Sequence, residues 1–231
     1  AGHPLPDAAG QDAARRVHAR VQGLSAEDLV LCLISGGGSA LLALPAAGIT
    51  LADKQSLTRA LLASGATISE INTLRKHLSA IKGGRLGLAA APARVVSLVL
   101  SDVPGDDPSV VASGPALPDR STLAEARRVL ERYRLTPPDA IARHLADPSA
   151  ETPKPEDPRL ARTGGAVIAT ARSALNAAAE AARASGVEPL ILGDAIEGEA
   201  REVAKDMAER ALAIRRESKP RGAPCVLLSG G

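Results

Sequence analysis

The chain has 231 residues, enough for one large α/β domain or two small ones, and a formal net charge of +2 at pH 7. This balanced charge gives no electrostatic reason to expect a nucleic acid or an anionic membrane as partner. The sequence contains no Phe or Trp and a single Tyr, Tyr133, so it lacks the aromatic platforms on which single-stranded nucleic acids stack. No apolar run reaches the roughly 18 residues of a membrane-spanning helix. We therefore expect neither a nucleic acid nor a membrane as partner.

The first predicted elements are a helix over Asp7–Leu24 and a strand over Leu29–Ile34. The strand is an aliphatic run without charge, which is typical of a parallel strand buried on both faces. A glycine-rich turn follows, and an apolar segment predicted to be helical begins at Ala40. Glycines let backbone N–H groups converge, and the first N–H groups of a helix point into the same space, so the turn either binds phosphate or is a tight turn that binds nothing. We predict a phosphate cradle made of Ser35, Gly36, Gly37, Gly38 and Ser39.

The next two helices are predicted from Thr50 to about Gly65 and from Ser69 to Gly83. At about 100° per residue, the second of these helices has an apolar stripe beside a polar stripe that carries three cations. Solvated helix faces usually mix both signs of charge, but this stripe contains no acid. We therefore predict that it faces an anionic ligand, with an ordinary solvated face as the alternative, and that His77 is exposed. The polar stripe comprises Asn72, Arg75, Lys76, Ser79 and Lys82.

A second strand is predicted over Arg94–Leu100, and acidic residues follow it directly. In open α/β sheets, ligands bind beyond the carboxyl ends of parallel strands, and carboxylates are common ligands of Mg²⁺. Asp102 stands just after the strand and is predicted to orient or deprotonate a substrate hydroxyl. Asp106 is predicted to contact the metal, whereas Asp107 is predicted to cap the following turn. Glycine turns combined with carboxylates favour phosphoryl transfer over hydride transfer.

The second half of the chain begins with predicted helices over Thr122–Arg134 and Pro138–Leu145. Residues 147–165 contain four prolines and many charges, which predicts a Pro-rich surface connection. From Val167 onward strands and helices alternate as βαβαβ, which predicts a parallel sheet. The predicted fold class is therefore α/β, a three-layer arrangement of a mostly parallel sheet with helices on both faces. The elements after the strand at Val167 are Ser173–Ala184, Val187–Leu192, Gly198–Glu217 and Cys225–Leu228.

The two cysteines, Cys32 and Cys225, each lie inside an apolar run, which predicts buried thiols and no metal site. The first residues, AGHPLPDAAG, have neither the basic nor the apolar region of a signal peptide. We therefore expect a cytoplasmic protein. The chain begins without Met and ends in a glycine turn, so we expect a fragment of a longer protein.

Several motifs are distributed along nearly the whole chain. They are AGHPLPDAAG, LCLISGGGSALLALP, GITLADKQSLTRALLASGATISEINTLRKHLSAIKGGRL, SDVPGDDPSVVASGP, ETPKPEDPRL, ILGDAIEGEAREVAK and LLSGG. Together they resemble the glycerate 2-kinase family, some members of which are labelled hydroxypyruvate reductases. The resemblance implies that residues 1–231 are part of the N-terminal α/β domain of such a kinase, truncated at both ends and inactive alone, because family members continue upstream and downstream.

The resemblance implies ATP-dependent phosphorylation of the 2-hydroxyl of D-glycerate, with Mg²⁺ as cofactor and with ATP and a small hydroxy acid as partners. Phosphoryl transfer needs a phosphate cradle, cations, a metal ligand and a group that orients the hydroxyl. Asp102 and Lys76 are the predicted catalytic residues, and Asp106 is the predicted metal ligand. Arg75 and Lys82 are predicted to bind the substrate, and the glycine turn the nucleotide.

Two alternatives stay open. An NAD(P)-dependent hydroxypyruvate reductase would need G-x-G-x-x-G after a strand, and SGGGSA does not have that spacing. A non-catalytic sugar-phosphate-binding module would need only the glycine turn and the cations. The sequence does not determine the oligomeric state.

Overall fold

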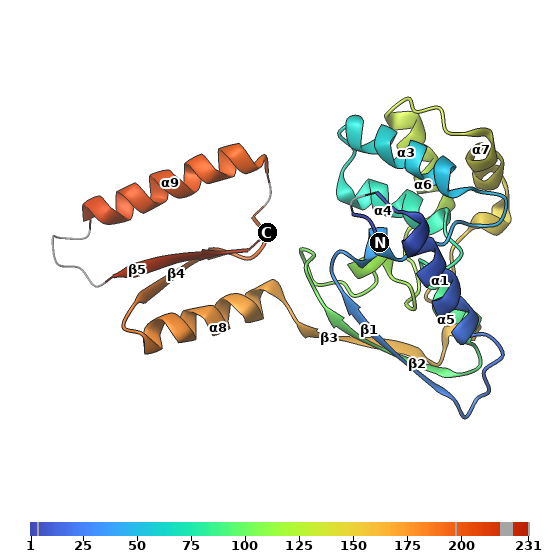
Figure 1. Cartoon of the computed structure of the whole chain (residues 1–231), viewed down its shortest axis with the longest axis horizontal. Helices are drawn as coiled ribbons and strands as arrows, with labels where there is room; N and C mark the ends of the chain where they lie inside the picture. The colour runs from blue at the N-terminus through green and yellow to red at the C-terminus, as the bar shows by residue number, and fades with distance from the viewer. Residues whose placement is uncertain (4, 197, 218–223, 231) are drawn as a thin grey trace. The chain divides into compact units, whose positions relative to one another are not determined.

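The computed structural model describes residues 1–3, 5–196, 198–217 and 224–230. The chain divides into two compact units, Ala1–Leu100 with Asp107–Val167, and Ser101–Asp106 with Ile168–Gly231. Each unit contains parallel strands flanked by helices, which confirms the predicted α/β class (Figure 1). Glu197 and Gly231, which belong to two of the motifs above, lie outside the described residues. No helix of the described ranges is long and apolar enough to cross a membrane.

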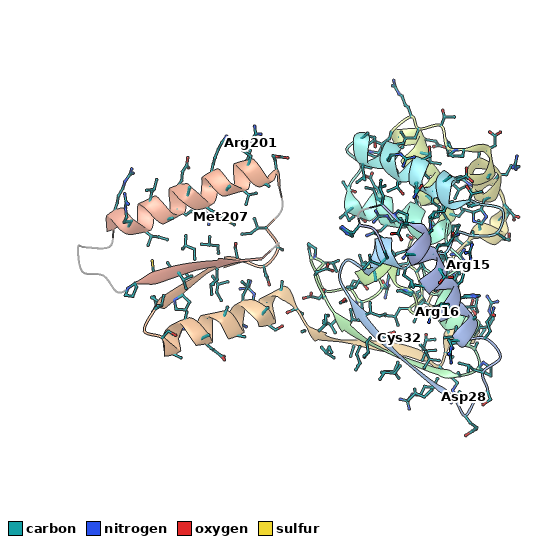
Figure 2. The ribbon with its side chains drawn as sticks, viewed as in Figure 1. Arg15, Arg16, Asp28, Cys32, Arg201 and Met207 are labelled. Atoms are coloured by element: carbon teal, nitrogen blue, oxygen red, sulfur yellow. The ribbon has the colours of Figure 1, made fainter. Side chains whose placement is uncertain are left out.

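The first unit contains a three-stranded sheet in the order β1-β2-β3, with bounds Leu29–Ser35, Arg94–Leu100 and Thr163–Ala169. β1 and β2 run parallel, with Leu29 opposite Arg94 and Ser35 opposite Leu100. Helices α1 (Ala8–Arg20) and α5 (Arg85–Ala90) lie on one side of this sheet (Figure 1). Val30 and Cys32 of β1 pack against a core of buried residues on that side. Figure 2 labels Cys32. This core consists of Ala14, Val21, Ile81, Leu86, Ala90, Val95 and Ala116.

The opposite face of β1 is exposed. Leu29, Leu31 and Leu33 have exposed fractions of 63%, 55% and 75%. Successive side chains of a strand point to opposite faces, and α1 and α5 cover only one of them. The prediction that this strand is buried on both faces is therefore wrong for the described residues.

A layer of helices completes the first unit and has a core of its own. The helices are α3 (Leu51–Ala63), α4 (Ile68–His77), α6 (Leu123–Arg132) and α7 (Asp139–Ala146). Three of them begin with a capping box, in which an N-cap threonine and an acid three residues later exchange hydrogen bonds. The inward residues predicted for α6 are all buried, which confirms its amphipathic pattern. They are Leu123, Ala126, Val129 and Leu130, and they pack with Leu57, Leu61, Ile71, Leu74, Leu78, Ile141 and Leu145.

Helix α4 both begins and ends earlier than predicted. It begins after Thr67, because Thr67 Oγ1 accepts a hydrogen bond from the Glu70 N–H while the Glu70 carboxylate accepts one from the Thr67 N–H. It ends at His77, after which Ser79 forms an antiparallel bridge to Pro45. Ser79 Oγ then accepts a hydrogen bond from the Lys82 N–H at 3.3 Å. The predicted polar stripe is therefore not one helical face, because its last two members lie in the turn that follows the helix.

Residues 147–165 contain two short 3-10 turns, Pro148–Ala150 and Pro158–Leu160. Within this stretch Ala150, Thr152, Pro153 and Leu160 are buried, so these residues anchor it to the rest of the first unit.

The second unit contains a two-stranded parallel sheet of β4 (Glu188–Gly193) and β5 (Cys225–Ser229). Helices α8 (Ala171–Ala184) and α9 (Ala200–Glu217) lie on opposite faces of this sheet, which gives three layers (Figure 1). The predicted continuous βαβαβ sheet is wrong, because β3 is a neighbour of β2 and not of β4.

Two sulfur-containing side chains of this unit have different surroundings. Met207 of α9 points toward the sheet, with its Sδ 3.9 Å from Ser229 Oγ (Figure 2). Cys225, at the first position of the edge strand β5, is exposed, contrary to the prediction of a buried thiol.

Candidate functional site: a cluster of buried cations

The glycine turn lies directly after β1. Gly37 has φ +76° and ψ −18°, a left-handed conformation that favours glycine. A Cβ atom built on Gly37 would meet no atom within 4 Å, so the turn is open at this point. Helix α2, which follows, has only four residues, Gly38–Leu41. Any ligand at this turn would therefore depend on the turn itself and on neighbouring side chains more than on a helix dipole.

A strained loop lies against the glycine turn. Three successive residues, Ala112, Ser113 and Gly114, have positive φ values of 53°, 61° and 54°. Each non-glycine residue in this conformation costs roughly 1–2 kcal/mol, and such strain is concentrated at functional sites. Hydrogen bonds from the N–H groups of Gly83 and Gly84 to the carbonyls of Ser113 and Gly114 hold the loop in place.

The loop connects the glycine turn to α4. Ser39 Oγ lies 2.6 Å from Ser113 Oγ, and Ser113 Oγ donates a hydrogen bond to Asn72 Oδ1 at 3.3 Å. Arg75 donates to the same Asn72 oxygen at 3.3 Å. Lys82 Nζ donates a long hydrogen bond of 3.5 Å to the carbonyl of Ala112, the neighbour of Ser113. The structure thus brings together three of the predicted site residues, namely Ser39, Arg75 and Lys82.

A third cation, Lys54 of α3, belongs to this region and was not predicted. Lys54, Arg75 and Lys82 form what we call the cationic cluster. The residues Lys54 and Lys82 are only 6% and 1% exposed. Burial, and then the charge of Arg75, lower the pKa of Lys54 to about 8. Burial, and then the charges of Lys54 and Arg75, hold the pKa of Lys82 well below its usual range.

No carboxylate of the described residues lies within ion-pair distance of any member of the cationic cluster. Lys54 could have been found from the sequence. It precedes Leu57, Thr58 and Leu61 at helical spacing, and all four residues are on the buried side of α3. A lysine in such a position is rarely buried without a functional or structural reason.

Lys76, the predicted catalytic lysine, lies in a different environment. Its Nζ is 2.9 Å from Asp119 Oδ1, and the Asp119 side chain is fully buried. Burial works to raise the pKa of Asp119, but the charge and hydrogen bond of Lys76, together with hydrogen bonds from Ser121, hold it below its usual range. The hydroxyl of Thr152 also donates to Asp119. This complete pairing favours a structural role for Lys76, so its catalytic role stays a prediction.

His77 was predicted to be exposed, but it is fully buried. Its Nδ1 lies 2.8 Å from the carbonyl oxygen of Thr73, and its Nε2 lies 3.0 Å from Glu151 Oε1. The prediction is wrong because residues 147–165 pack over the end of α4. The sequence alone does not show that Glu151 of this segment lies beside His77.

The acidic residues after β2 were predicted to act on the hydroxyl and the metal. Asp102 is exposed, and Asp106 has a positive φ of 53°. Neither carboxylate has a hydrogen bond or ion pair to the described residues. Both belong to the second unit, whereas the cationic cluster belongs to the first. Asp107 accepts hydrogen bonds from the N–H and the hydroxyl of Ser109, as expected for a residue that caps a turn.

The described residues contain no group of three or more His, Cys, Asp or Glu that could hold a metal ion. Mg²⁺, however, commonly uses only one or two protein carboxylates and takes its other ligands from substrate phosphates and water. The unpaired carboxylates of Asp102 and Asp106 fit that donor chemistry.

Comparison with known proteins shows to which family the chain belongs. A family model described as "Domain of unknown function (DUF4147)" matches residues 1–146. The chain is 52% identical to a putative hydroxypyruvate reductase of Agrobacterium vitis and 42% identical to the D-glycerate 2-kinase of Thermotoga maritima, in each case over its whole length. It covers 52% and 54% of those two proteins.

A solved structure, that of glycerate kinase from Thermotoga maritima, superimposes on the whole chain with a TM-score of 0.79 at 42% identity. The chain covers 54% of that structure, so it spans about half the length of the relatives it matches. The chain belongs to the DUF4147 family and is a homologue of the glycerate kinases.

Proposed function

We propose that this protein transfers a phosphoryl group from ATP to D-glycerate and forms 2-phosphoglycerate. One observation carries the proposal: the cationic cluster, with two buried lysines and the half-buried Arg75, lies next to the strained loop and the glycine turn, and no carboxylate of the described residues neutralises it. The names of the relatives, D-glycerate 2-kinase and glycerate kinase, support the same reaction.

Phosphoryl transfer is catalysed mainly by positioning and by neutralisation of negative charge. In this proposal, Arg75 and Lys82 bind the acidic groups of the reactants. The residues of the glycine turn, Ser35 to Ser39, bind the nucleotide phosphates through their N–H groups and hydroxyls. Ser113 and Asn72 hold Ser39 and Arg75 in place through the hydrogen bonds described above.

Two carboxylates of the second unit supply the remaining chemistry of the proposed reaction. Mg²⁺, when bound, would neutralise negative charge on the phosphates. Asp106 would hold the metal. Asp102 would orient the 2-hydroxyl of glycerate or accept its proton, and loss of such a group costs roughly 100-fold in rate. We therefore expect Asp102→Asn to reduce kcat of the full-length protein by about that factor. A kcat within twofold of the wild type would move the role to another residue.

The test is to incubate the full-length protein with ATP labelled in its γ-phosphate and with D-glycerate, and then to separate 2- and 3-phosphoglycerate. Label in 2-phosphoglycerate is expected, and label in the 3-isomer alone would contradict the proposed product. The 231-residue chain should bind the reactants without turnover, because the relatives are about twice as long.

One relative is named as a putative hydroxypyruvate reductase, so the same preparation should also be assayed with hydroxypyruvate and with NADH or NADPH. Oxidation of the nicotinamide without any phosphoryl transfer would show that the protein is a reductase. Binding of sugar phosphates with neither reaction would indicate a non-catalytic binding module.

A further inference from the structure

The cationic cluster has an unusual energetic balance. Its members come from α3, from α4 and from the turn after α4, and two of them are more than nine-tenths buried. A buried charge costs several kcal/mol unless an opposite charge accompanies it. Within the described ranges Lys54 has neither a hydrogen bond nor an ion pair, and Lys82 has only its long contact with the Ala112 carbonyl. The folded protein therefore bears a cost that a bound anion would offset.

Neutral donors lie beside these cations. Asn72 Oδ1 accepts hydrogen bonds from both Ser113 and Arg75, and this leaves the two N–H groups of its Nδ2 to donate elsewhere. No described residue accepts from Asn72 Nδ2. Among the described residues the site thus offers positive charge and free N–H donors but no carboxylate. This combination suits the binding of an oxyanion.

We propose that Lys54, Arg75 and Lys82 together hold one phosphate group of the ligand, and that the site takes up a proton from solvent when the phosphate enters. This proposal depends on the proposed function in one respect only, namely the identity of the phosphate compound that binds. A phosphate dianion would compensate two of the three positive charges, whereas a carboxylate, with a single negative charge, would compensate only one.

The proton uptake follows from the surroundings of the lysines. The charged groups that act on Lys82 are Lys54 of α3 and Arg75 of α4, and the strained loop contributes only the Ala112 carbonyl. Because Lys54 has a pKa of about 8 in the free protein, its amine is neutral in about half of the protein molecules at pH 8. A phosphate dianion favours the charged ammonium and raises this pKa again, so binding draws protons into the cluster.

The test is isothermal titration calorimetry of inorganic phosphate into the full-length protein at pH 8, in HEPES and in Tris. These buffers differ in ionisation enthalpy, so the difference between the two observed binding enthalpies gives the number of protons taken up. We expect an uptake of about half a proton or more per phosphate. ADP and 2-phosphoglycerate, titrated separately, show which compound supplies the phosphate, and D-glycerate serves as the carboxylate comparison.

Lys54→Met separates this role from a structural one. The substitution removes the charge and keeps an unbranched chain, so we expect at least tenfold weaker phosphate binding, loss of most of the proton uptake and no fall in the melting temperature without ligand. Arg59→Met, an exposed position on the same helix, is the matched control and should leave all three quantities unchanged. If Lys54→Met does not fold, Lys54→Gln takes its place.

Phosphate binding without proton uptake in the wild type would overturn the inference. So would unchanged binding in the Lys54 variant, or D-glycerate binding with proton uptake while phosphate does not bind. Calorimetry requires no turnover. A protein that binds phosphate with proton uptake but does not phosphorylate glycerate would therefore contradict the proposed function and leave this inference intact.

Discussion

Two groups of largely buried charges include neighbouring residues of helix α4, and only one of the groups is neutralised by partners among the described residues. Arg75 and Lys76 are adjacent in α4, yet Lys76 is fully paired with Asp119 whereas Arg75 belongs to the cationic cluster. The paired network consists of Lys76, His77, Asp119, Glu151 and Thr152. Opposite charges and hydrogen bonds within this network explain why it can be buried without a ligand. The cationic cluster has no opposite charge among the described residues.

The difference separates scaffold from site by a physical criterion. A buried charge with a partner is balanced within the fold, and removal of either partner leaves the other charge uncompensated. A buried charge without a partner lowers the stability of the free protein, so its removal should not harm the fold. The predictions below test this contrast, from the largest expected effect to the smallest.

The strongest test of the paired network is Asp119→Asn. This change leaves the buried ammonium of Lys76 without a counter-charge, so the free energy of unfolding should fall by roughly 3–5 kcal/mol. Urea denaturation gives the value. The double variant Lys76→Met with Asp119→Leu should recover most of the loss, because neither charge then remains. A loss below 1 kcal/mol in the single variant would show that the ion pair does not hold this region together.

The corresponding test of the cationic cluster is Lys82→Met in the full-length protein. Loss of one group that stabilises transferring charge costs about 100-fold or more, so kcat/KM for glycerate phosphorylation should fall by at least that factor. The melting temperature should stay the same or rise, because an uncompensated buried charge is gone. A variant that is clearly less stable would place Lys82 with the paired network and break the contrast.

The stability of the wild type should depend on pH because of Lys54. Its pKa is lowered from 10.5 to about 8 in the folded chain, so above pH 8 the unfolded state binds more protons than the folded state. The free energy of unfolding should therefore rise with pH in this window. Between pH 8 and pH 10 the wild type should gain about 2 kcal/mol more than Lys54→Met, as measured by urea denaturation. Parallel curves for the two proteins would show that Lys54 titrates normally.

The smallest effect concerns the glycine turn. Gly37→Ala places a side chain at φ +76° in open space, so the strain alone should cost about 1 kcal/mol of stability. If nucleotide phosphates approach this turn, the added methyl group should also weaken ATP binding by about tenfold in calorimetry. Unchanged ATP affinity would remove the glycine turn from the site and leave the cationic cluster as its only anion-binding part.

Local features of the fold could be predicted from the sequence because neighbouring residues determine them. The strand over Arg94–Leu100 has the predicted bounds, and the amphipathic helix after Thr122 buries the predicted face. The glycine turn after β1 also stands where its composition placed it. The predicted start of α4 is too late because the prediction uses Ser69 as its cap, whereas Thr67 forms the capping box with Glu70. Its predicted end is too late because the bridge between Ser79 and Pro45 is a tertiary contact.

The sequence by itself determined which segments are strands and helices, apart from α5, and which cations and acids are present to act. Only the tertiary structure decided which of those charges are neutralised. Lys76 meets Asp119 across 43 residues of chain, and Ser39 meets Ser113 across 74. It also decided that β3 joins β2, and that Lys54 lies beside Arg75. Periodicity describes one element at a time, whereas the pairing of a buried charge depends on residues from elements that are distant in the chain.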